Sequence, residues 1–184
     1  VYLLEFGFEL LPAPNETRTA GYTFRQVTAG PFFACGILEN DRLLCWGEEE
    51  LAAQTPPPRK FSDISVGLDV GCGILEDGGL MCWPARGAFD RDNAAADVPD
   101  GTFRDVDVRT TSIACAVASS GEITCWGDTA LGSRDGDFQA VSVGRFYACG
   151  LRTDGALECW STNGDCQNQS QMGEMVDEAL VEQL

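Results

Sequence analysis

Four copies of one pattern predict an all-β protein built from repeated antiparallel sheets. The copies begin at Phe24, Phe61, Phe103 and Phe138, so successive starts are 37, 42 and 35 residues apart. Apolar residues alternate with polar ones between turn signals, which is typical of short antiparallel strands. A period near 40 residues with several strands per unit is typical of a β-propeller blade. The sequence therefore predicts a β-propeller with four visible blades.

The first strand of each unit is predicted from a block of seven residues. The blocks read FRQVTAG, FSDISVG, FRDVDVR and FQAVSVG. Each has an aliphatic residue three positions after Phe, and a glycine closes all but the third block, where Arg109 stands. This alternation predicts a short strand with one apolar side.

The next two strands are predicted to form a hairpin that brings two cysteines together. In the second unit, nine residues separate Cys72 from Cys82, and Trp83 follows directly. A three-residue loop at 76–78 with Gly78 in the left-handed conformation would place the two cysteines opposite each other. Their Cα atoms would then be about 4.5 Å apart, at the short end of the range for disulfides. Three residues occupy the position of Gly78 in the other units: Asp41, Gly121 and Gly155.

Eight of the nine cysteines stand in such pairs, so we expect one disulfide within each hairpin. The expected pairs are Cys35–Cys45, Cys72–Cys82, Cys115–Cys125 and Cys149–Cys159. Free buried thiols and a metal site are the alternatives, although the spacing of two to four residues that zinc ligands usually show is missing. Cys166 is left unpaired, or bonds another chain or another part of the protein. Disulfides in this number predict an oxidising, extracellular location.

The segments around the repeats carry other signals. Asn15 in NET and Asn168 in NQS are candidate glycosylation sites, which agrees with an extracellular location. Residues 1–23 predict a strand and linker that would complete a blade, and residues 162–184 predict a loop and a short amphipathic helix. The four repeats within 24–161 are expected at 24–60, 61–102, 103–137 and 138–161.

The charge and composition exclude several classes of function. There are 29 acidic residues against 12 basic ones, a formal net charge of −17, and no histidine. Nucleic-acid binding is not expected because it depends on Lys and Arg at phosphates. No apolar run approaches the roughly 20 residues of a membrane span. Without histidine, His-dependent catalysis and His-ligated zinc are excluded. The acidic surface is expected to be solvated, with a basic partner or divalent cations as the alternative.

Three groups of residues are candidate chemical sites. A candidate calcium loop contains Asp90, Asp92, Asn93 and Asp97, but three alanines interrupt it, and a solvated loop is favoured. Asp135 and Asp137 are candidate carboxylate catalysts, but turns also use Asp and Gly for backbone reasons. The aromatics of AGPFFACG and GRFYACG are candidate sugar-stacking residues, although a core position is favoured. The sequence therefore predicts no catalytic, cofactor or metal site.

Each repeat consists of Phe-x-x-Val-x-x-Gly, Cys-Gly-Ile/Leu, a glycine turn and Leu-x-Cys-Trp-Gly. Over residues 24–161, this unit resembles the repeats of the regulator of chromosome condensation family. It is most similar to the disulfide-containing extracellular branch, with the ectodomains of crinkly-type receptor kinases and secreted bacterial repeat proteins. The resemblance implies blades of four antiparallel strands, with the tryptophans packed between blades in a ring of about seven. With four blades, the open edges imply either a longer protein or cover by another copy or chain. The nuclear founder of the family activates a small GTPase and contacts chromatin. This acidic chain lacks the positive charge for chromatin binding, and its residues do not match those expected for GTPase activation.

The expected function is a non-enzymatic, secreted or cell-surface module for protein–protein interaction and a structural building block of an extracellular assembly. The alternative is a fragment of a receptor ectodomain that binds a peptide or glycan. Other protein chains, copies of itself and glycans are the expected partners. Nucleic acid, membrane insertion and cofactors are not expected.

Overall fold

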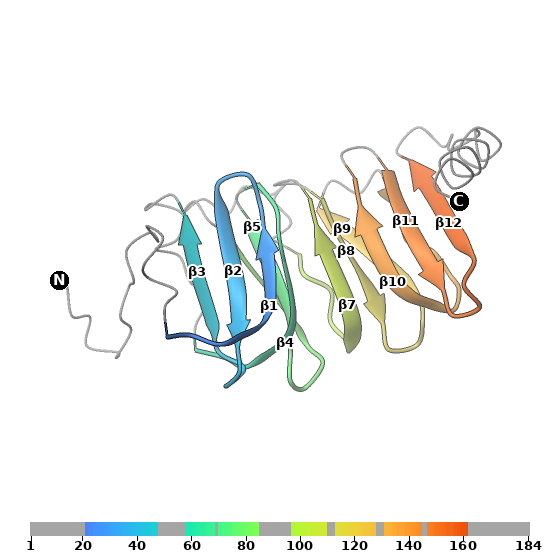
Figure 1. Cartoon of the computed structure of the whole chain (residues 1–184). Helices are drawn as coiled ribbons and strands as arrows, with labels where there is room; N and C mark the ends of the chain where they lie inside the picture. Colours follow the sequence, from blue (N-terminus) through green and yellow to red (C-terminus); the bar gives the residue numbers. More distant parts are fainter. Residues whose placement is uncertain are drawn as a thin grey trace, which may run out of the picture.

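The computed structural model describes residues 21–47, 58–68, 70–84, 97–109, 113–127, 131–144 and 147–161. These residues form four separate antiparallel sheets of three strands each, and they contain no helix (Figure 1). The predicted all-β fold of the propeller type is confirmed. A closed ring is not seen in the described part of the chain.

The three strands of each sheet follow one another in the sequence and in space. In chain order they are β1 (Phe24–Ala29), β2 (Phe33–Leu38), β3 (Leu43–Gly47), β4 (Phe61–Val66), β5 (Val70–Leu75), β6 (Leu80–Pro84), β7 (Phe103–Val108), β8 (Ile113–Ala118), β9 (Ile123–Gly127), β10 (Phe138–Val143), β11 (Tyr147–Arg152) and β12 (Leu157–Ser161). We call β1, β4, β7 and β10 the first strands.

Each first strand begins at the Phe of its repeat and is bulged one residue later. In β1, Phe24 pairs with Leu38 but Gln26 pairs with Ile37, so Arg25 is the extra residue. The same shift occurs in the other three sheets. Such a bulge sets which side chains of the strand share a face with those of its neighbour. After it, Val27 lies opposite Gly36 on one face of the sheet.

The hairpin between the second and third strands has the predicted register. Ile74 pairs with Leu80 and Cys72 with Cys82, and Gly78 closes the loop with a φ of 87°. Asp41 has a φ of 65°, which places it in the left-handed region, as expected for the residue that replaces this glycine. Each hairpin carries a disulfide between facing cysteines, with Cα atoms 4.0 Å apart, closer than the separation of about 4.5 Å expected.

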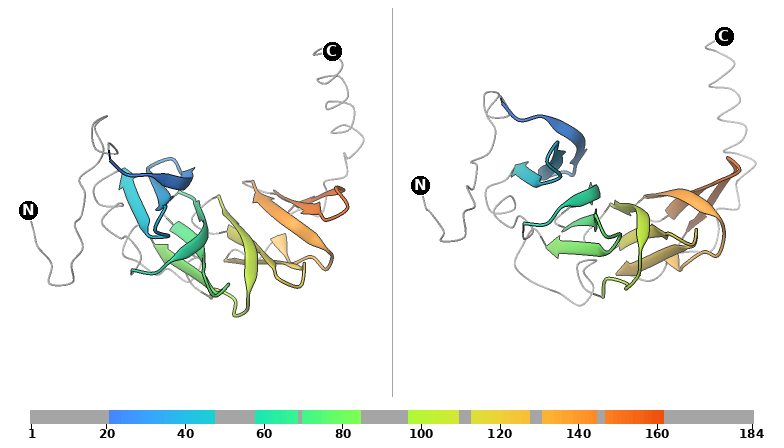
Figure 2. Two further views of the ribbon diagram at one scale, coloured as in Figure 1. Left: turned by 60° about the horizontal axis from the view of Figure 1, so that its bottom comes forward. Right: turned by 90° about the horizontal axis from the view of Figure 1, so that it is seen from below.

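The sheets follow one another along a curved row, with β1–β3 at one end and β10–β12 at the other (Figure 2). Contact between neighbours is made by the first strand of the later sheet. Thus β4 lies against β1 and β2, β7 against β4 and β5, and β10 against β7 and β8. The core therefore consists of three similar apolar layers, one between each pair of sheets.

The described sheets have three strands, whereas the family resemblance implied four per blade. In the described part of the connecting segments, isolated β-bridges join Arg42 to Lys60 and Ile123 to Arg134. Most of each connecting segment lies outside the described residues, as do the expected strand within 1–23 and the expected helix within 162–184. In the described residues, no helix is long and apolar enough to cross a membrane.

Candidate interaction surfaces at the two ends of the row

Each sheet has two chemically different faces. Neighbouring residues of a strand point to opposite sides, so the cysteine and the tryptophan that follows it lie on different faces. We call the face with the tryptophan the head face and the face with the disulfide the tail face. On the head face of β4–β6, Trp83 packs against Phe61 with ring centroids 5.8 Å apart. It also covers Gly71, where a Cβ would lie 2.5 Å from the indole. A small residue is therefore needed beneath the ring.

Within the row, the head face of each sheet covers the tail face of the sheet before it. Ile64 and Val66 of β4 pack with Cys35 and Ile37 of β2 in one apolar cluster. The other two layers repeat this arrangement, with Val106 and Val108 against Val70, Cys72 and Ile74, and with Val141 and Val143 against Ile113, Cys115 and Val117. Burial of these two apolar faces is the main force that holds neighbouring sheets together.

A backbone hydrogen bond recurs at every junction. The amide of the Phe that starts a first strand donates to the carbonyl of the hairpin-turn residue in the preceding sheet. The three bonds are Phe61 to Asp41 at 3.0 Å, Phe103 to Gly78 at 2.8 Å and Phe138 to Gly121 at 2.9 Å. The residue with positive φ therefore has two roles, since it closes its own hairpin and accepts the first amide of the next sheet.

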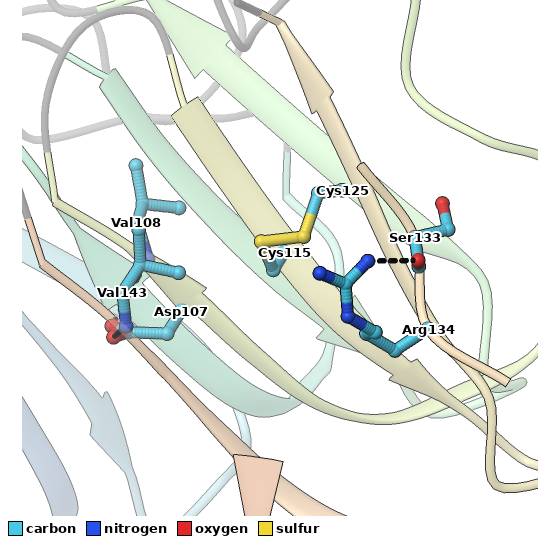
Figure 3. The surroundings of a disulfide bond; sticks show 7 residues. All are labelled: Asp107, Val108, Cys115, Cys125, Ser133, Arg134 and Val143. Atoms are coloured by element: carbon cyan, nitrogen blue, oxygen red, sulfur yellow. Dashed lines mark hydrogen bonds between the residues drawn. A yellow bond between two sulfur atoms is a disulfide. The ribbon is translucent and has the colours of Figure 1, made fainter. Parts of the chain in front are cut away.

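A side-chain hydrogen bond also recurs. The fourth residue after the Phe offers an oxygen to the amide of a valine in the next first strand. Thr28 accepts from Val66 at 3.3 Å, and Ser65 accepts from Val108 at 3.0 Å. At the third junction Asp107 takes this place and accepts from the amide of Val143 at 2.6 Å (Figure 3). These bonds satisfy amides at the edge of each first strand.

Carboxylates of the first strands gather between β4, β7 and β10. Asp105 accepts from the amide of Val141 at 2.6 Å. The pKa of Asp105 is raised from 3.8 to about 6, mainly by burial and also by the charges of Asp63 and Asp107, while the bonds from the Val141 and Val106 amides oppose the rise. Within the described residues, no group of three or more potential ligands is arranged to hold a metal ion.

At each end of the row, one sheet face is not covered by another of the described sheets. On the head face of β1–β3, Val27 is 64% exposed, whereas Ile64 at the same position of the next sheet is 3% exposed. The tail face of β10–β12 shows the same contrast. Leu157 is 61% exposed and Tyr147 is 51% exposed, whereas Ile123 and Phe33 at equivalent positions are 0% and 3% exposed. These apolar end faces, 24–29 with 33–38 and 147–152 with 157–161, are the candidate interaction surfaces.

Several candidates from the sequence have structural roles. Phe33 is buried in the first apolar layer, as favoured, but Phe32 and Tyr147 are exposed, contrary to that interpretation. Tyr147 is exposed because no other sheet among the described residues covers its face. The carboxylate of Asp137 accepts from the Thr153 hydroxyl at 3.0 Å, and its carbonyl accepts from the Thr153 amide at 2.9 Å. Asp137 therefore orders the turn of its own sheet.

Other predicted site residues lie outside the described residues. They are Asn15, Asp90, Asp92, Asn93, Cys166 and Asn168. The glycosylation sites, most of the calcium loop and the fate of the ninth cysteine therefore stay predictions. Asp97, the remaining member of that loop, has a φ of 52°.

Among the end-face residues, the sequence drew attention to Tyr147 alone, as a candidate sugar-stacking aromatic. Val27, Leu151 and Leu157 look like ordinary core residues of a repeat, and only their position in the first or last unit distinguishes them. An alignment of the four repeats would have identified them as the members of the first and last visible units. The oxygen-bearing side chains between first strands gave no comparable signal.

Comparison with known proteins supports the resemblance. The family model described as "Regulator of chromosome condensation (RCC1) repeat" matches residues 24–50. The ectodomain of the receptor kinase CR4 from Physcomitrella patens is 26% identical, with a TM-score of 0.61 over 75% of this chain and 39% of that chain. The CRINKLY WD40 ectodomain of the Arabidopsis thaliana receptor kinase ACR4 is 24% identical, with a TM-score of 0.61 over 75% and 49%.

A third similar structure shares the fold alone. Prp20p from Saccharomyces cerevisiae, described together with its binding to Gsp1p and histones, is 11% identical, with a TM-score of 0.59 over 81% of this chain and 47% of that chain. This chain spans less than half the length of each of the three structures. The predicted resemblance is confirmed: the chain carries RCC1-like repeats in a propeller-type arrangement, and its four disulfides fit the disulfide-containing branch.

Proposed function

We propose that the chain is a non-enzymatic, extracellular propeller module that binds other proteins through its end faces and acts as a building block of an assembly. The observation that carries the proposal is the pair of uncovered apolar faces, each of which is buried at the equivalent position inside the row. Apolar patches of this kind on a folded protein mark interaction sites. The four disulfides support an extracellular location.

Site-specific cross-linking on the native protein tests binding through the end faces. A photo-reactive amino acid at Val27 or Leu157 is expected to give cross-links to protein in the native setting. The matched control is the same group at Asp77, an exposed turn residue of the second sheet. Equal cross-linking at all three positions, or none at Val27 and Leu157, would contradict the proposal.

Thiol alkylation tests the location. Protein isolated from its source without reductant and then unfolded in denaturant is expected to expose no more than the thiol of Cys166, because the remaining cysteines are paired. Alkylation of the hairpin cysteines under these conditions would place the protein in a reducing compartment and remove the support for an extracellular module.

A receptor ectodomain that binds a peptide or glycan is the second candidate. It is favoured by the 26% identity with the ectodomain of the receptor kinase CR4. A transcript that joins this chain to a membrane-spanning segment and a kinase would support the receptor. A transcript encoding only secreted repeats would support the assembly module.

A further inference from the structure

We propose that the partner of the end faces is a second copy of this chain, bound head to tail. In this arrangement the tail face of β10–β12 in one copy packs against the head face of β1–β3 in the next. The inference rests on the proposed function and names its partner. It is argued from the three junctions inside the chain, each of which shows how one repeat covers another.

The apolar residues on the two end faces are of the types that meet at the internal junctions. On the tail face, Tyr147, Leu151 and Leu157 stand where the first sheet has Phe33, Ile37 and Leu43. On the head face, Phe24, Val27 and Trp46 stand where the second sheet has Phe61, Ile64 and Trp83. Inside the chain, the tail-face residues Phe33, Ile37 and Leu43 and the head-face residues Phe61, Ile64 and Trp83 meet in one layer between β1–β3 and β4–β6. In the same way, the tail face of one copy would meet the head face of the next copy.

The recurring backbone hydrogen bond joins a Phe amide to a turn carbonyl, and among the described residues one such group at each end of the row lacks its counterpart. Gly155 is the hairpin-turn residue of the last sheet, with a φ of 89°, and nothing lies within 4 Å of the position of a Cβ there. At the equivalent Gly121, that position is 3.0 Å from Gly136, in the segment leading to the next first strand. By the pattern of the three internal bonds, the Gly155 carbonyl would accept from the amide of Phe24 in the next copy.

The recurring side-chain bond also has a matching pair. Ser142 occupies the acceptor position of the last sheet, and its hydroxyl donates to Asp107 at 3.3 Å. Ser65 also donates to Asp107, which for Ser65 lies in the following sheet and not the preceding one, at 2.8 Å, while it accepts the amide of Val108. A hydroxyl that donates one hydrogen bond can still accept another. Ser142 is therefore placed to accept the amide of Ala29, the residue of β1 equivalent to Val108, from the next copy.

Pairing of two identical ends does not reproduce these bonds. Two head faces would bring together amides of first strands without the carbonyl and hydroxyl acceptors, and two tail faces would bring together acceptors without the amides. Only head-to-tail contact supplies both. A contact between different surfaces of identical copies continues until it closes into a ring or extends as a filament.

Sedimentation velocity on the full 184-residue chain tests the proposal through a pair of single substitutions, Val27→Glu on the head face and Leu157→Glu on the tail face. The wild-type chain is expected to self-associate with rising concentration, and added salt should strengthen association because each copy carries a charge of −17.

Each variant alone is expected to associate more weakly, with a Kd raised by about tenfold or more. An equimolar mixture of the two is expected to form a heterodimer and nothing larger, because one intact head and one intact tail remain. Leu68→Glu, an exposed apolar residue between β4 and β5, is the control and should associate like the wild type.

The outcomes separate the alternatives. A wild-type chain that stays monomeric up to its solubility limit overturns the proposal, and so does self-association of Leu157→Glu through two head faces. A marked loss of thermal stability in monomeric Val27→Glu also overturns it, since the head face would then be covered by the chain's own residues. If the chain is monomeric but still cross-links another protein at position 27, only self-pairing fails. If it cross-links nothing, the proposed function fails too.

Discussion

The hydroxyl of Ser65 accepts a hydrogen bond from the backbone amide of Val108 at 3.0 Å, and the two residues lie in neighbouring sheets. The same hydroxyl donates to the carboxylate of Asp107 at 2.8 Å. Ser65 is buried, with 7% of its surface exposed, so water does not replace these partners. The side chain of Ser65 thus joins β4 to β7 through two hydrogen bonds, and the effect of its removal on stability should be measurable.

We expect Ser65→Ala to lower the free energy of unfolding by about 1–2 kcal/mol. The substitution removes the acceptor of a buried amide, but the loss is partial because Val108 also donates to Asp107 at 3.0 Å. Urea unfolding of the oxidised protein measures the change. Ser62→Ala is the matched control, because this exposed hydroxyl bonds within its own sheet, and its effect should stay within about 0.5 kcal/mol. Equal effects of the two substitutions would show that the bond between sheets contributes nothing.

Asp105 gives the second prediction, a pH dependence of stability. Its pKa is raised by burial to about 6 in the folded protein, above the ordinary value of 3.8 that we assign to the unfolded chain. The folded state therefore binds a proton more tightly than the unfolded state. The stabilisation from this proton is fully present below pH 3.8 and is lost as the pH rises through 6.

Asp105→Asn is expected to remove this dependence, because the amide oxygen can still accept from Val141 and carries no charge. The stability of the variant relative to wild type should rise as the pH increases from about 4 to 7. Urea midpoints across this range measure the difference. Asp77→Asn, the same change at an exposed turn, should show little rise by comparison. A difference between Asp105→Asn and wild type that is flat with pH would contradict the raised pKa.

The hairpins could be predicted from the sequence because their geometry is local. The nine residues between Cys72 and Cys82, with a glycine at the left-handed position, leave a single register for a three-residue loop. The same reasoning identified Asp41 as the residue that takes the place of glycine in the first hairpin. The repeat period and the strand lengths then predict the propeller-type fold, because a single sheet of three strands cannot bury its own two faces.

The end faces could not be predicted from residue type, because exposure there depends on a neighbour. Val27 and Ile64 occupy the same position of the repeat and are both aliphatic, yet one is exposed and the other is buried. Similarly, Asp105 bonds across a junction while Ala140, at the same position of the last repeat, has no side-chain oxygen to do so. Such differences arise from packing between sheets that are distant in sequence.

A third prediction concerns the order in which the disulfides are reduced. In each of the first three disulfides at least one cysteine has no exposed surface, because the next sheet covers Cys35, Cys72 and Cys115, whereas both cysteines of the last disulfide, on the tail face of β10–β12, are partly exposed. Attack by a thiolate requires access to a sulfur atom. The bond between Cys149 and Cys159 should therefore be reduced first under native conditions.

Timed reduction, alkylation and peptide mass spectrometry measure this order. Denatured protein is the control, in which the rates of the four bonds should converge because their loops are of equal length. Head-to-tail association would protect the last disulfide, so its reduction should slow as protein concentration rises. Faster native reduction of the bond at Cys35 would contradict the assignment of covered and uncovered faces.

The fourth prediction compares two glycines that share a backbone conformation but differ in their surroundings. Gly121 and Gly155 have φ values of 103° and 89° in equivalent hairpin turns. A side chain at positive φ is strained at either position, by about 1–2 kcal/mol, partly offset by the lower entropy of the unfolded chain. At Gly121 the added Cβ also lies 3.0 Å from the carbonyl of Gly136, whereas at Gly155 it meets nothing within 4 Å. Gly121→Ala should therefore destabilise the folded protein by about 1 kcal/mol more than Gly155→Ala in urea unfolding.

Equal losses of stability in the two variants would show that the turn does not support the next sheet. Because the turn at Gly155 would meet the next copy as the turn at Gly121 meets the next sheet, Gly155→Ala should also weaken self-association in sedimentation, although the folded monomer tolerates it better.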